Sequence, residues 1–464
     1  MKLDLHQIAQ WAGADLTGIE HALVHVATGY SIDSRTLQPC DLFIAIKGER
    51  FDGHDFVAPA FERGAMAALV AREKLAALPE EAHRHPLLIV DDPLTALQQL
   101  AAAVRKHWGK RVVAITGSAG KTTTKEAIAK VLDARFSVLK SQGNLNNGYG
   151  LPLQLLKLEP KNEVAVIEMG MSSVGEIAAL ARIASPDWGV VTNVGNAHAE
   201  FFPEGIAGIA RAKYELIEAL PAQGVAFLNC DDAYVSQFGR DFRGKAIYFG
   251  RGPCADPKAE SIEPLGADGL RIGVRAGEHR ATLHLHLLGE HNVSNALAAI
   301  AVGLEAGIPL ETCCDALGEL LPEDKRGQIL NIHGATIIND SYNSNPEALK
   351  AMIQTLASMP VAGDGRRILV AGEMLELGPE SVALHASCGK AAAEVGIDIV
   401  AGVRGHAQHI VEAARQGSLE ALYFESPGQA GEWLRDNLRA GDVILLKASR
   451  GVKLERALNA LRAD

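Results

Sequence analysis

The sequence predicts an α/β protein of three domains, and three observations support this fold. The chain has 464 residues, more than a single hydrophobic core usually contains. From Leu94 onward β-branched runs alternate with helical patterns, which is typical of a mostly parallel sheet with helices on both faces. After residues 321–327 the alternation starts again. We therefore expect domains at residues 1–91, 92–325 and 326–464, each with its own sheet.

The first domain is predicted to be a small α/β unit. A helical pattern covers Leu5–Trp11, Leu42–Ile46 reads as a buried strand, and a last strand before Asp91 leads into a linker. Loops around the buried strand carry Ser34, Arg35 and Lys47, side chains that suit a phosphorylated ligand. A solvated surface loop is the alternative interpretation.

The second domain begins with a strand, a glycine-bounded turn and a helix, over residues 112–132. Backbone N–H groups at such a helix start can hold phosphate oxygens. Lys121 is placed to reach the terminal phosphates, and the Thr122 hydroxyl to bind magnesium. The general phosphate-loop pattern has its first glycine where this chain has Ile115. The predicted phosphate-binding residues are Gly117, Ser118, Ala119, Gly120, Lys121, Thr122 and Thr123.

Polar residues follow further strands of this domain. Glu168 ends the strand that starts at Val164, and His198 follows the strand that starts at Gly189. Ligands of parallel sheets lie beyond the carboxyl ends of the strands, so both side chains are predicted to contact metal or phosphate. Residues 255–288 alternate with period two and predict a small antiparallel subsheet. Asn292 and Asn295 near a helix start suit either capping or contacts with a base or ribose.

The third domain has two polar loops at strand ends. The first contains Asp340, Tyr342, Asn343 and Asn345, and the second, residues 447–453, is a basic turn able to meet a carboxylate or phosphate. Each could be only a turn. Because both fall at strand ends of one sheet, we expect a substrate site there.

Composition restricts the classes of partner and the location. The net charge of −11 argues against nucleic acid as a bulk partner. No apolar run is long enough to cross a bilayer and nothing resembles a signal peptide, so we expect a cytoplasmic protein without membrane insertion. The six cysteines have no C-x-x-C pairing, which predicts reduced cysteines and no zinc site.

Four segments together resemble the Mur ligases of peptidoglycan synthesis. They are Asp33-Ser34-Arg35 with Phe51-Asp52-Gly53-His54, the turn from Thr116 to Thr122, Gly143-Asn144-Leu145-Asn146-Asn147 with Gly150-Leu151-Pro152, and residues 339–346. The shorter phosphate loop is that family's own form. The family member that adds the third peptide residue typically carries Asp-Asn-Pro-Arg in its C-terminal domain, and this chain lacks it.

The resemblance implies an ATP-dependent ligase of cytoplasmic cell-wall synthesis. The details of the resemblance imply the family member that joins D-alanyl-D-alanine to the peptide carboxylate of UDP-N-acetylmuramoyl-tripeptide through an acyl phosphate. The resemblance further implies three domains: a small UDP-binding domain, a central ATPase domain and a Rossmann-like C-terminal domain. A monomer is expected.

The resemblance also assigns roles to residues. Lys121 would contact the terminal phosphates; Thr122 and Glu168 would hold one Mg²⁺, and His198 and Lys213 the second, with Lys213 as a carbamate. On sequence alone Lys213 would be a solvated helical lysine. ATP would contact Asn292, Asn295, Arg326 and Asp340. The substrate-binding set is predicted to be Ser34, Arg35, Lys47, Asn144, Asn147, Tyr342, Asn343 and Asn345.

Three other functions are alternatives to this one. A related ligase of the same superfamily would differ in its amino acceptor, for example by adding glutamate to folate. A GTPase-type binding protein needs a guanine-selecting Asn-Lys-x-Asp, which this chain lacks. A scaffold protein does not explain polar clusters at so many strand ends.

Overall fold

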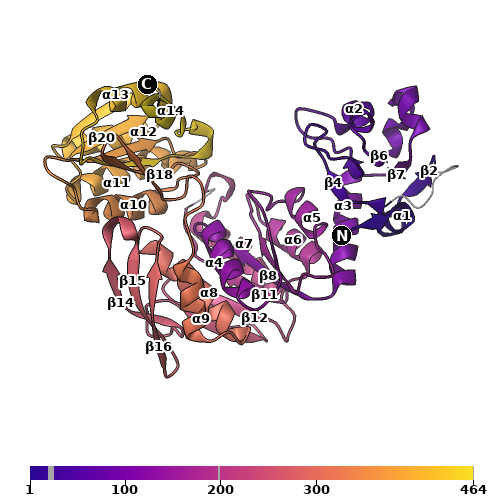
Figure 1. Cartoon of the computed structure of the whole chain (residues 1–464), viewed down its shortest axis with the longest axis horizontal. Coiled ribbons are helices and arrows are strands. Elements are labelled where there is room, and N and C mark those ends of the chain that lie inside the picture. The colour runs from indigo at the N-terminus through magenta and orange to yellow at the C-terminus, as the bar shows by residue number, and fades with distance from the viewer. Residues whose placement is uncertain (19–25, 197–198, 463–464) are drawn as a thin grey trace.

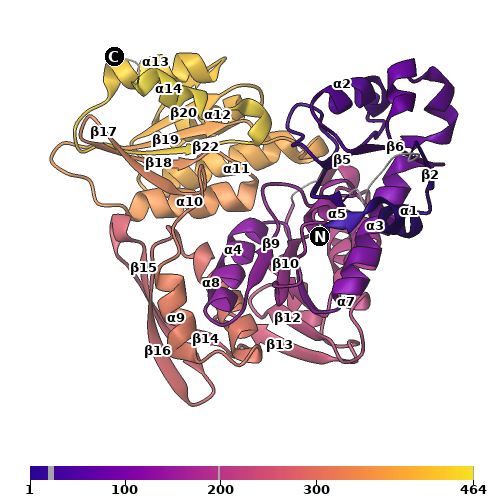
Figure 2. The ribbon, with the colours of Figure 1, turned by 45° about the vertical axis from the view of Figure 1, so that its right-hand side comes forward.

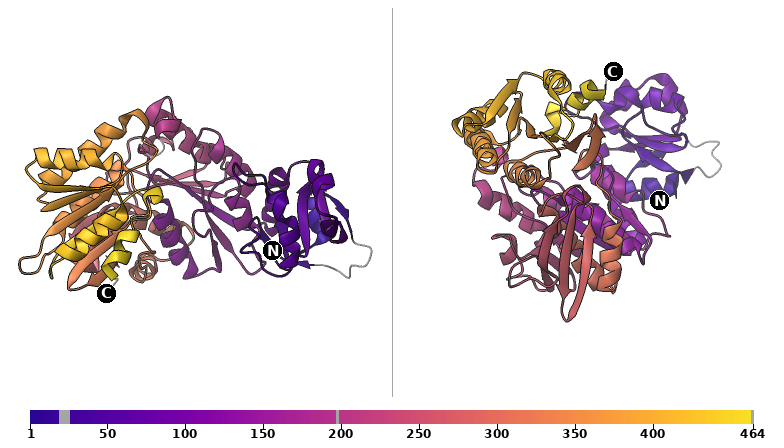
Figure 3. Two further views of the ribbon diagram at one scale, coloured as in Figure 1. Left: turned by 90° about the horizontal axis from the view of Figure 1, so that it is seen from above. Right: turned by 60° about the vertical axis from the view of Figure 1, so that its left-hand side comes forward.

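The computed structural model describes residues 1–18, 26–196 and 199–462, and its sheets form three α/β bodies along the chain. In Figure 1 and in the left view of Figure 3, the N-terminal and C-terminal bodies lie at opposite ends with the central body between them. The predicted α/β fold with three domains is therefore confirmed.

The N-terminal body is built on a five-stranded sheet in the order β2-β7-β6-β5-β4. Strand β5 ends at Ile44, two residues earlier than predicted, because the chain turns there and the Ile46 carbonyl accepts the Gly53 N–H. The elements are β1 (Leu3–Asp4), α1 (Leu5–Ala12), β2 (Asp15–Thr17), β3 (Val26–Ala27), β4 (Gly29–Ser31), β5 (Asp41–Ile44), α2 (Val57–Glu62), β6 (Ala67–Ala71) and β7 (Leu87–Val90).

The central body has a six-stranded, fully parallel sheet in the order β13-β12-β11-β8-β10-β9, and one of its faces is covered by α4, α8, α9 and the predicted antiparallel subsheet. The strands are β8 (Arg111–Thr116), β9 (Val138–Lys140), β10 (Val164–Glu168), β11 (Trp188–Val191), β12 (Val225–Asn229) and β13 (Lys245–Phe249), with β14 (Lys258–Pro264), β15 (Leu270–Ala276) and β16 (His279–Leu285) in the subsheet. The helices are α3 (Pro93–Trp108), α4 (Lys121–Asp133), α5 (Gly150–Leu155), α6 (Glu176–Ala184), α7 (Gly205–Glu218), α8 (His291–Glu305) and α9 (Leu310–Gly318).

Helix α3 joins the N-terminal and central bodies. The expected linker after β7 is short: Asp91 and Asp92 alone separate the strand from the helix, and Asp92 caps the helix. Its buried residues, Leu97 and Leu100 among them, belong to one hydrophobic core with residues of both sheets. Arg105, also buried, donates to the carbonyls of Ala184 and Ser185 at the end of α6. Packing thus fixes the N-terminal body against the central one.

The C-terminal body has a six-stranded sheet in the order β17-β18-β22-β19-β20-β21, parallel except for β17 (Figure 2). Sequence reasoning missed β17 and β21, because these edge strands are half-exposed and lack a continuous apolar run. The strands are β17 (Gln328–Ile332), β18 (Ala335–Asp340), β19 (Arg367–Gly372), β20 (Ile399–Val403), β21 (Glu420–Phe424) and β22 (Val443–Lys447). The helices are α10 (Pro346–Ser358), α11 (Ser381–Glu394), α12 (Ala407–Gln416), α13 (Pro427–Asn437) and α14 (Arg456–Arg462).

The structure bears on the expected state of the cysteines and on membrane-spanning helices. A disulfide bond links Cys230 and Cys254, whose Cα atoms are 5.9 Å apart, so the prediction that all six cysteines are reduced is wrong for this pair. The spacing of 24 residues gave no sequence signal, because the chain returns through β13 before the two meet. Among the described residues, no helix is long and apolar enough to cross a membrane.

The shared core around α3 predicts that the N-terminal and central bodies unfold together. Leu97→Ala should lower the free energy of unfolding by about 2–5 kcal/mol, since Leu97 is fully buried and its removal leaves a cavity. Urea unfolding followed by tryptophan fluorescence should show one transition for both bodies, shifted to lower urea. The exposed Lys106→Ala on the same helix is the control and should stay within about 0.5 kcal/mol. Two separate transitions for these bodies would contradict the shared core.

Candidate active site

The turn between β8 and α4 has the backbone of a phosphate-binding loop. Gly117 has φ 153° and Gly120 φ 78°, conformations that favour glycine. A Cβ atom would lie 1.8 Å from Thr192 Oγ1 at Gly117 and 2.5 Å from Asn295 Oδ1 at Gly120, so both positions also exclude a side chain. Ile115 lies inside β8, where it is fully buried. A glycine is therefore not needed at that position of this shorter loop.

The sequence suggests that the backbone amides of this loop are available to phosphate, but two of them are already hydrogen-bonded. The Ser118 N–H donates to the Asn193 carbonyl at 3.0 Å, and the Ala119 N–H donates to Asn193 Oδ1 at 2.8 Å. Helix α4 begins at Lys121 without a side-chain cap. The residues of its first turn, Lys121, Thr122 and Thr123, line a cleft. The amides of this first turn are the ones available to an anion.

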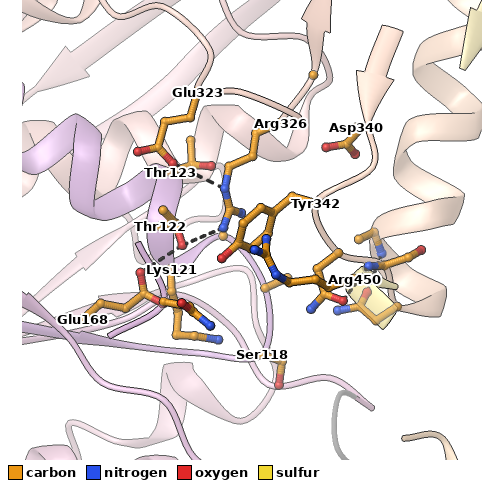
Figure 4. A pocket seen from close by; sticks show the side chains of 18 of the residues that line it. Ser118, Lys121, Thr122, Thr123, Glu168, Glu323, Arg326, Asp340, Tyr342 and Arg450 are labelled. Carbon is orange, nitrogen blue, oxygen red and sulfur yellow. Dashed lines mark hydrogen bonds and ion pairs between the residues drawn. The ribbon is translucent and has the colours of Figure 1, made fainter. Parts of the chain in front are cut away.

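Thr122 and Glu168 meet at the base of the loop. Thr122 Oγ1 donates to Glu168 Oε2 at 2.9 Å (Figure 4). Asn146 Nδ2 donates to the other carboxylate oxygen, Glu168 Oε1, at 2.8 Å. Arg326, from the C-terminal segment, donates to Thr122 Oγ1 at 3.1 Å. A hydroxyl and a carboxylate are hard oxygen ligands of the kind that Mg²⁺ prefers. Among the described residues, no three His, Cys, Asp or Glu side chains form a complete metal cluster.

Two lysines of the central body are enclosed by protein. Lys121 Nζ donates to the Gly117 carbonyl at 2.7 Å, and burial lowers its pKa. Lys213 on α7 is only 2% exposed; burial, followed by the positive charge of Lys121, lowers its pKa well below 10.5. The prediction of a solvated helical lysine is therefore wrong. His198, the predicted partner of Lys213, lies outside the described residues.

The two asparagines of α8 contact each other and the phosphate loop. Asn295 Nδ2 donates to Asn292 Oδ1 at 2.8 Å, and Asn295 Oδ1 accepts the Thr124 hydroxyl of α4. Asn292 also donates to the Leu288 carbonyl. Neither caps the helix through its side chain, and both line the cleft.

A buried ion pair organises the loop after β18. Lys447 Nζ, at the end of β22, lies 2.6 Å from Asp340 Oδ2 and donates to the Asn343 carbonyl at 3.0 Å. Lys447 is 4% exposed and lines a cleft, where Asp340 and the Asn343 carbonyl already contact its ammonium group. Asn345 caps α10 by accepting the Ala348 N–H, and Asn343 Oδ1 accepts the Ser344 N–H. The loop is thus held by its own polar side chains.

Tyr342 contacts two arginines. The Arg326 guanidinium lies 3.9 Å from the centre of its ring, and that of Arg450 lies 4.7 Å away. Figure 4 shows the three side chains together in the middle of the cleft. Cations over an aromatic face attract its electrons, so the stack orients both guanidinium groups.

These residues line one cleft of about 500 Å³ between the central and C-terminal bodies. The predicted site residues that line it are Ser118, Ala119, Gly120, Lys121, Thr122, Thr123, Asn144, Asn147, Glu168, Asn292, Asn295, Arg326, Asp340, Tyr342, Asn343 and Asn345. Gly117 and Lys213 do not line the cleft themselves, but both lie close to Lys121, which does. One cavity therefore unites residues from two sheets.

The predicted N-terminal residues do not line this cleft. Arg35 is exposed and pairs with Asp33 at 2.7 Å, Lys47 is exposed and Ser34 is half-buried. They belong to the body at the opposite end of the molecule in Figure 1. A ligand that touches both regions has to be long.

Sequence reasoning missed Asn146, Asn193, Lys447 and Arg450 as single site residues. Asn146 belongs to the motif at residues 143–147, in which only its neighbours Asn144 and Asn147 are predicted site residues. Asn147 instead accepts the amides of Tyr149 and Gly150 at the start of α5. Which asparagine of such a run faces Glu168 depends on the local turn, and spacing does not reveal it.

Comparison with known proteins identifies the class. Three family models match in order along the chain: the Mur ligase family catalytic domain at residues 26–105, the Mur ligase middle domain at 115–303, and the Mur ligase glutamate ligase domain at 325–450. Together with the cleft between the last two regions, these matches show that the chain belongs to the Mur ligase family.

More narrowly, the chain belongs with the MurF ligases of that family. It is 38% identical to the UDP-N-acetylmuramoyl-tripeptide--D-alanyl-D-alanine ligase of Bacillus subtilis, over 95% of this chain and 94% of the relative. A crystal structure of MurF from Acinetobacter baumannii superimposes with a TM-score of 0.88 at 29% identity, over 100% of this chain and 99% of that one. MurF from Thermotoga maritima in complex with ADP gives a TM-score of 0.81 at 29% identity, over 94% and 97%.

The Asp340–Lys447 pair predicts a stability cost when one partner is removed. Lys447→Met should lower the free energy of unfolding by about 3 kcal/mol, because it leaves the Asp340 carboxylate without its cation in a largely buried place. Adding Asp340→Asn should recover part of this loss. The exposed Lys453→Met in the same turn is the control for both, measured by urea unfolding. Equal effects of Lys447→Met and Lys453→Met would contradict the role of the pair.

Proposed function

We infer that the protein is an ATP-dependent ligase that joins D-alanyl-D-alanine to the peptide carboxylate of UDP-N-acetylmuramoyl-tripeptide, in peptidoglycan precursor synthesis. The observation that carries this inference is the contact of Arg326 with Thr122, which brings the C-terminal body to the phosphate loop. The names of the full-length relatives support the substrates, and the ADP complex of a homologue supports ATP as the nucleotide.

The reaction needs a carboxylate to be activated, because a carboxylate is a poor electrophile at neutral pH. The tripeptide carboxylate attacks the γ-phosphate of ATP, giving an acyl phosphate and ADP; the dipeptide amine then attacks the acyl carbon and releases phosphate. We assign the transferred phosphoryl charge to Lys121, the α4 amides and Arg326, and their common place in the cleft supports this assignment. Their role is to position and stabilise that charge.

We propose that Thr122 and Glu168 hold one Mg²⁺, and His198 and Lys213 a second. The metal ions would offset the charge of the phosphates where several anionic groups meet. Arg326 then exchanges its contact with Thr122 for one with the phosphates. Asn292, Asn295 and Asp340 would bind the nucleoside of ATP, and Tyr342, Asn343 and Asn345 the acceptor end of the cleft.

We propose further that Lys213 is carbamylated. A neutral lysine amine attacks carbon dioxide and forms a carbamate with loss of one proton, which converts a cation into an oxygen ligand. Enclosure that lowers the pKa of Lys213 supplies the neutral amine. A lysine ammonium in this place would repel both Lys121 and a metal ion.

The remaining proposals concern the rest of the molecule. We propose domains at residues 1–91, 92–325 and 326–464, with Ser34, Arg35 and Lys47 holding the UDP end of the nucleotide peptide and Asn144 and Asn147 contacting its middle. The separation of these loops from the cleft agrees with a long substrate whose peptide end reaches the phosphate loop. A cytoplasmic monomer completes the proposal.

The first test is acceptor choice. Phosphate release from ATP should require UDP-N-acetylmuramoyl-tripeptide together with D-alanyl-D-alanine, and the product mass should rise by one dipeptide less water. Reactions with single amino acids and with no acceptor are the controls. Turnover with a single amino acid in place of the dipeptide would move the protein to a sibling ligase.

The carbamate proposal predicts a pH-dependent signal. With isotope-labelled carbon dioxide, NMR of the protein should show a carbamate carbon at alkaline pH; acidification through the lowered pKa of Lys213 should remove it, because only the neutral amine reacts. Lys213→Ala should abolish the signal and most of the activity, whereas Lys161→Ala, an exposed lysine, should change neither. Full activity of Lys213→Ala at ordinary magnesium would contradict the role.

A further inference from the structure

At the end of β22 and in the turn that follows, some side chains hold neighbouring loops in place and one is exposed in the cleft. Lys447 and Ser449 are buried, at 4% and 5% exposure. Ser449 Oγ accepts the Leu375 N–H at 2.9 Å and donates to the Ser344 carbonyl at 3.4 Å, while Lys447 pairs with Asp340. These contacts fix the ends of β18, β19 and β22 relative to one another. The next residue, Arg450, therefore has a well-defined position.

Arg450 is exposed and extends into the cleft. The Arg450 guanidinium stacks on the ring of Tyr342. Within residues 1–18, 26–196 and 199–462, it forms no ion pair and no hydrogen bond. The other lysines and arginines that line the cleft are engaged. Lys121 donates to Gly117, Arg326 contacts Thr122 and lies 3.4 Å from Glu323, and Lys447 pairs with Asp340. Arg450 thus offers an unneutralised cation.

The position of Arg450 distinguishes it from the phosphate-binding cations. It comes from the C-terminal sheet, beside the loop of residues 340–345, whereas Lys121 and Thr122 lie across the cleft (Figure 4). Arg326 and Arg450 lie 3.9 and 4.7 Å from the same ring centre, so their separation cannot exceed the sum of those distances. An extended dipeptide is about 7 Å long, which lies within that upper limit.

The chemistry of the acceptor leaves one anion to be bound. The tripeptide carboxylate and the dipeptide amine are consumed in the new bond, and the phosphates belong to the loop at α4. The carboxylate at the far end of the dipeptide survives the reaction, and taking it from water is costly unless it is paired. A guanidinium donates two parallel hydrogen bonds to a carboxylate, which also fixes its orientation.

We propose that Arg450 binds the C-terminal carboxylate of the D-alanyl-D-alanine acceptor and so selects a free dipeptide acid. The proposal rests on the proposed function and assigns its acceptor end. With the carboxylate held at Arg450, the amine points toward the side of the cleft where Arg326 contacts Thr122.

The test compares D-alanyl-D-alanine with its C-terminal amide in the wild type and in Arg450→Gln. In the wild type the amide should have a KM roughly 10- to 100-fold higher than the acid, the range expected for a charged hydrogen-bonded contact. Arg450→Gln should raise the KM of the acid by a similar factor, should make acid and amide nearly equal, and should leave the KM of ATP and of the nucleotide peptide unchanged. Lys453→Gln, in the same turn but outside the cleft, should keep the preference for the acid.

The outcomes separate this inference from the proposed function. If wild type turns over the dipeptide and Arg450→Gln still prefers the acid, or raises the KM of ATP or nucleotide peptide instead, the inference is overturned. If Arg450→Gln fails to fold, Arg450→Lys takes its place, and an unweakened preference for the acid would count against the proposal. No turnover of the dipeptide by the wild type would overturn the proposed function itself.

Discussion

The hydrogen bonds at Thr122 are the interaction on which the site depends. Thr122 contacts Glu168 on a neighbouring strand and Arg326, which lies 204 residues further along the chain. These two bonds place an anion-binding helix start, a carboxylate and the Arg326 guanidinium in one small volume. They also define how close the C-terminal body must come to the central one for the cleft to exist.

The C-terminal body contributes order as well as charge. Its buried Asp340–Lys447 pair and the hydrogen bonds of Ser449 hold three strand-end loops together. Side chains that could have bound a ligand are used to shape the loops, and Tyr342, Arg326 and Arg450 are then presented from a fixed frame. The central body uses a polar side chain in the same way. Asn193 accepts hydrogen bonds from two amides of the phosphate loop, while the amides of the first turn of α4 remain available to a ligand.

The N-terminal body is tied to the central one by a different force. Helix α3 supplies apolar residues to a core shared by both sheets, and Arg105 adds hydrogen bonds to the end of α6. The C-terminal body meets the central one across a cleft that polar contacts bridge, and Leu288 of the central body packs into the C-terminal core. Polar contacts across a cleft exchange readily with those of a ligand, whereas a shared core does not, so adjustment on binding is expected at the cleft.

The sequence by itself determined the α/β class, the phosphate loop and most residues at strand ends, because period, β-branching and glycine position are local properties that one segment carries alone. Tertiary structure decided the rest. Burial, which lowers the pKa of Lys213, comes from distant segments. Asn146 and not Asn147 reaches Glu168, and Lys447 pairs with Asp340 while Arg450 stays exposed. The pairing of Cys230 with Cys254 likewise needed the path of the chain through β13. Each of these outcomes depends on which side chains meet across elements, and spacing along one segment does not contain that information.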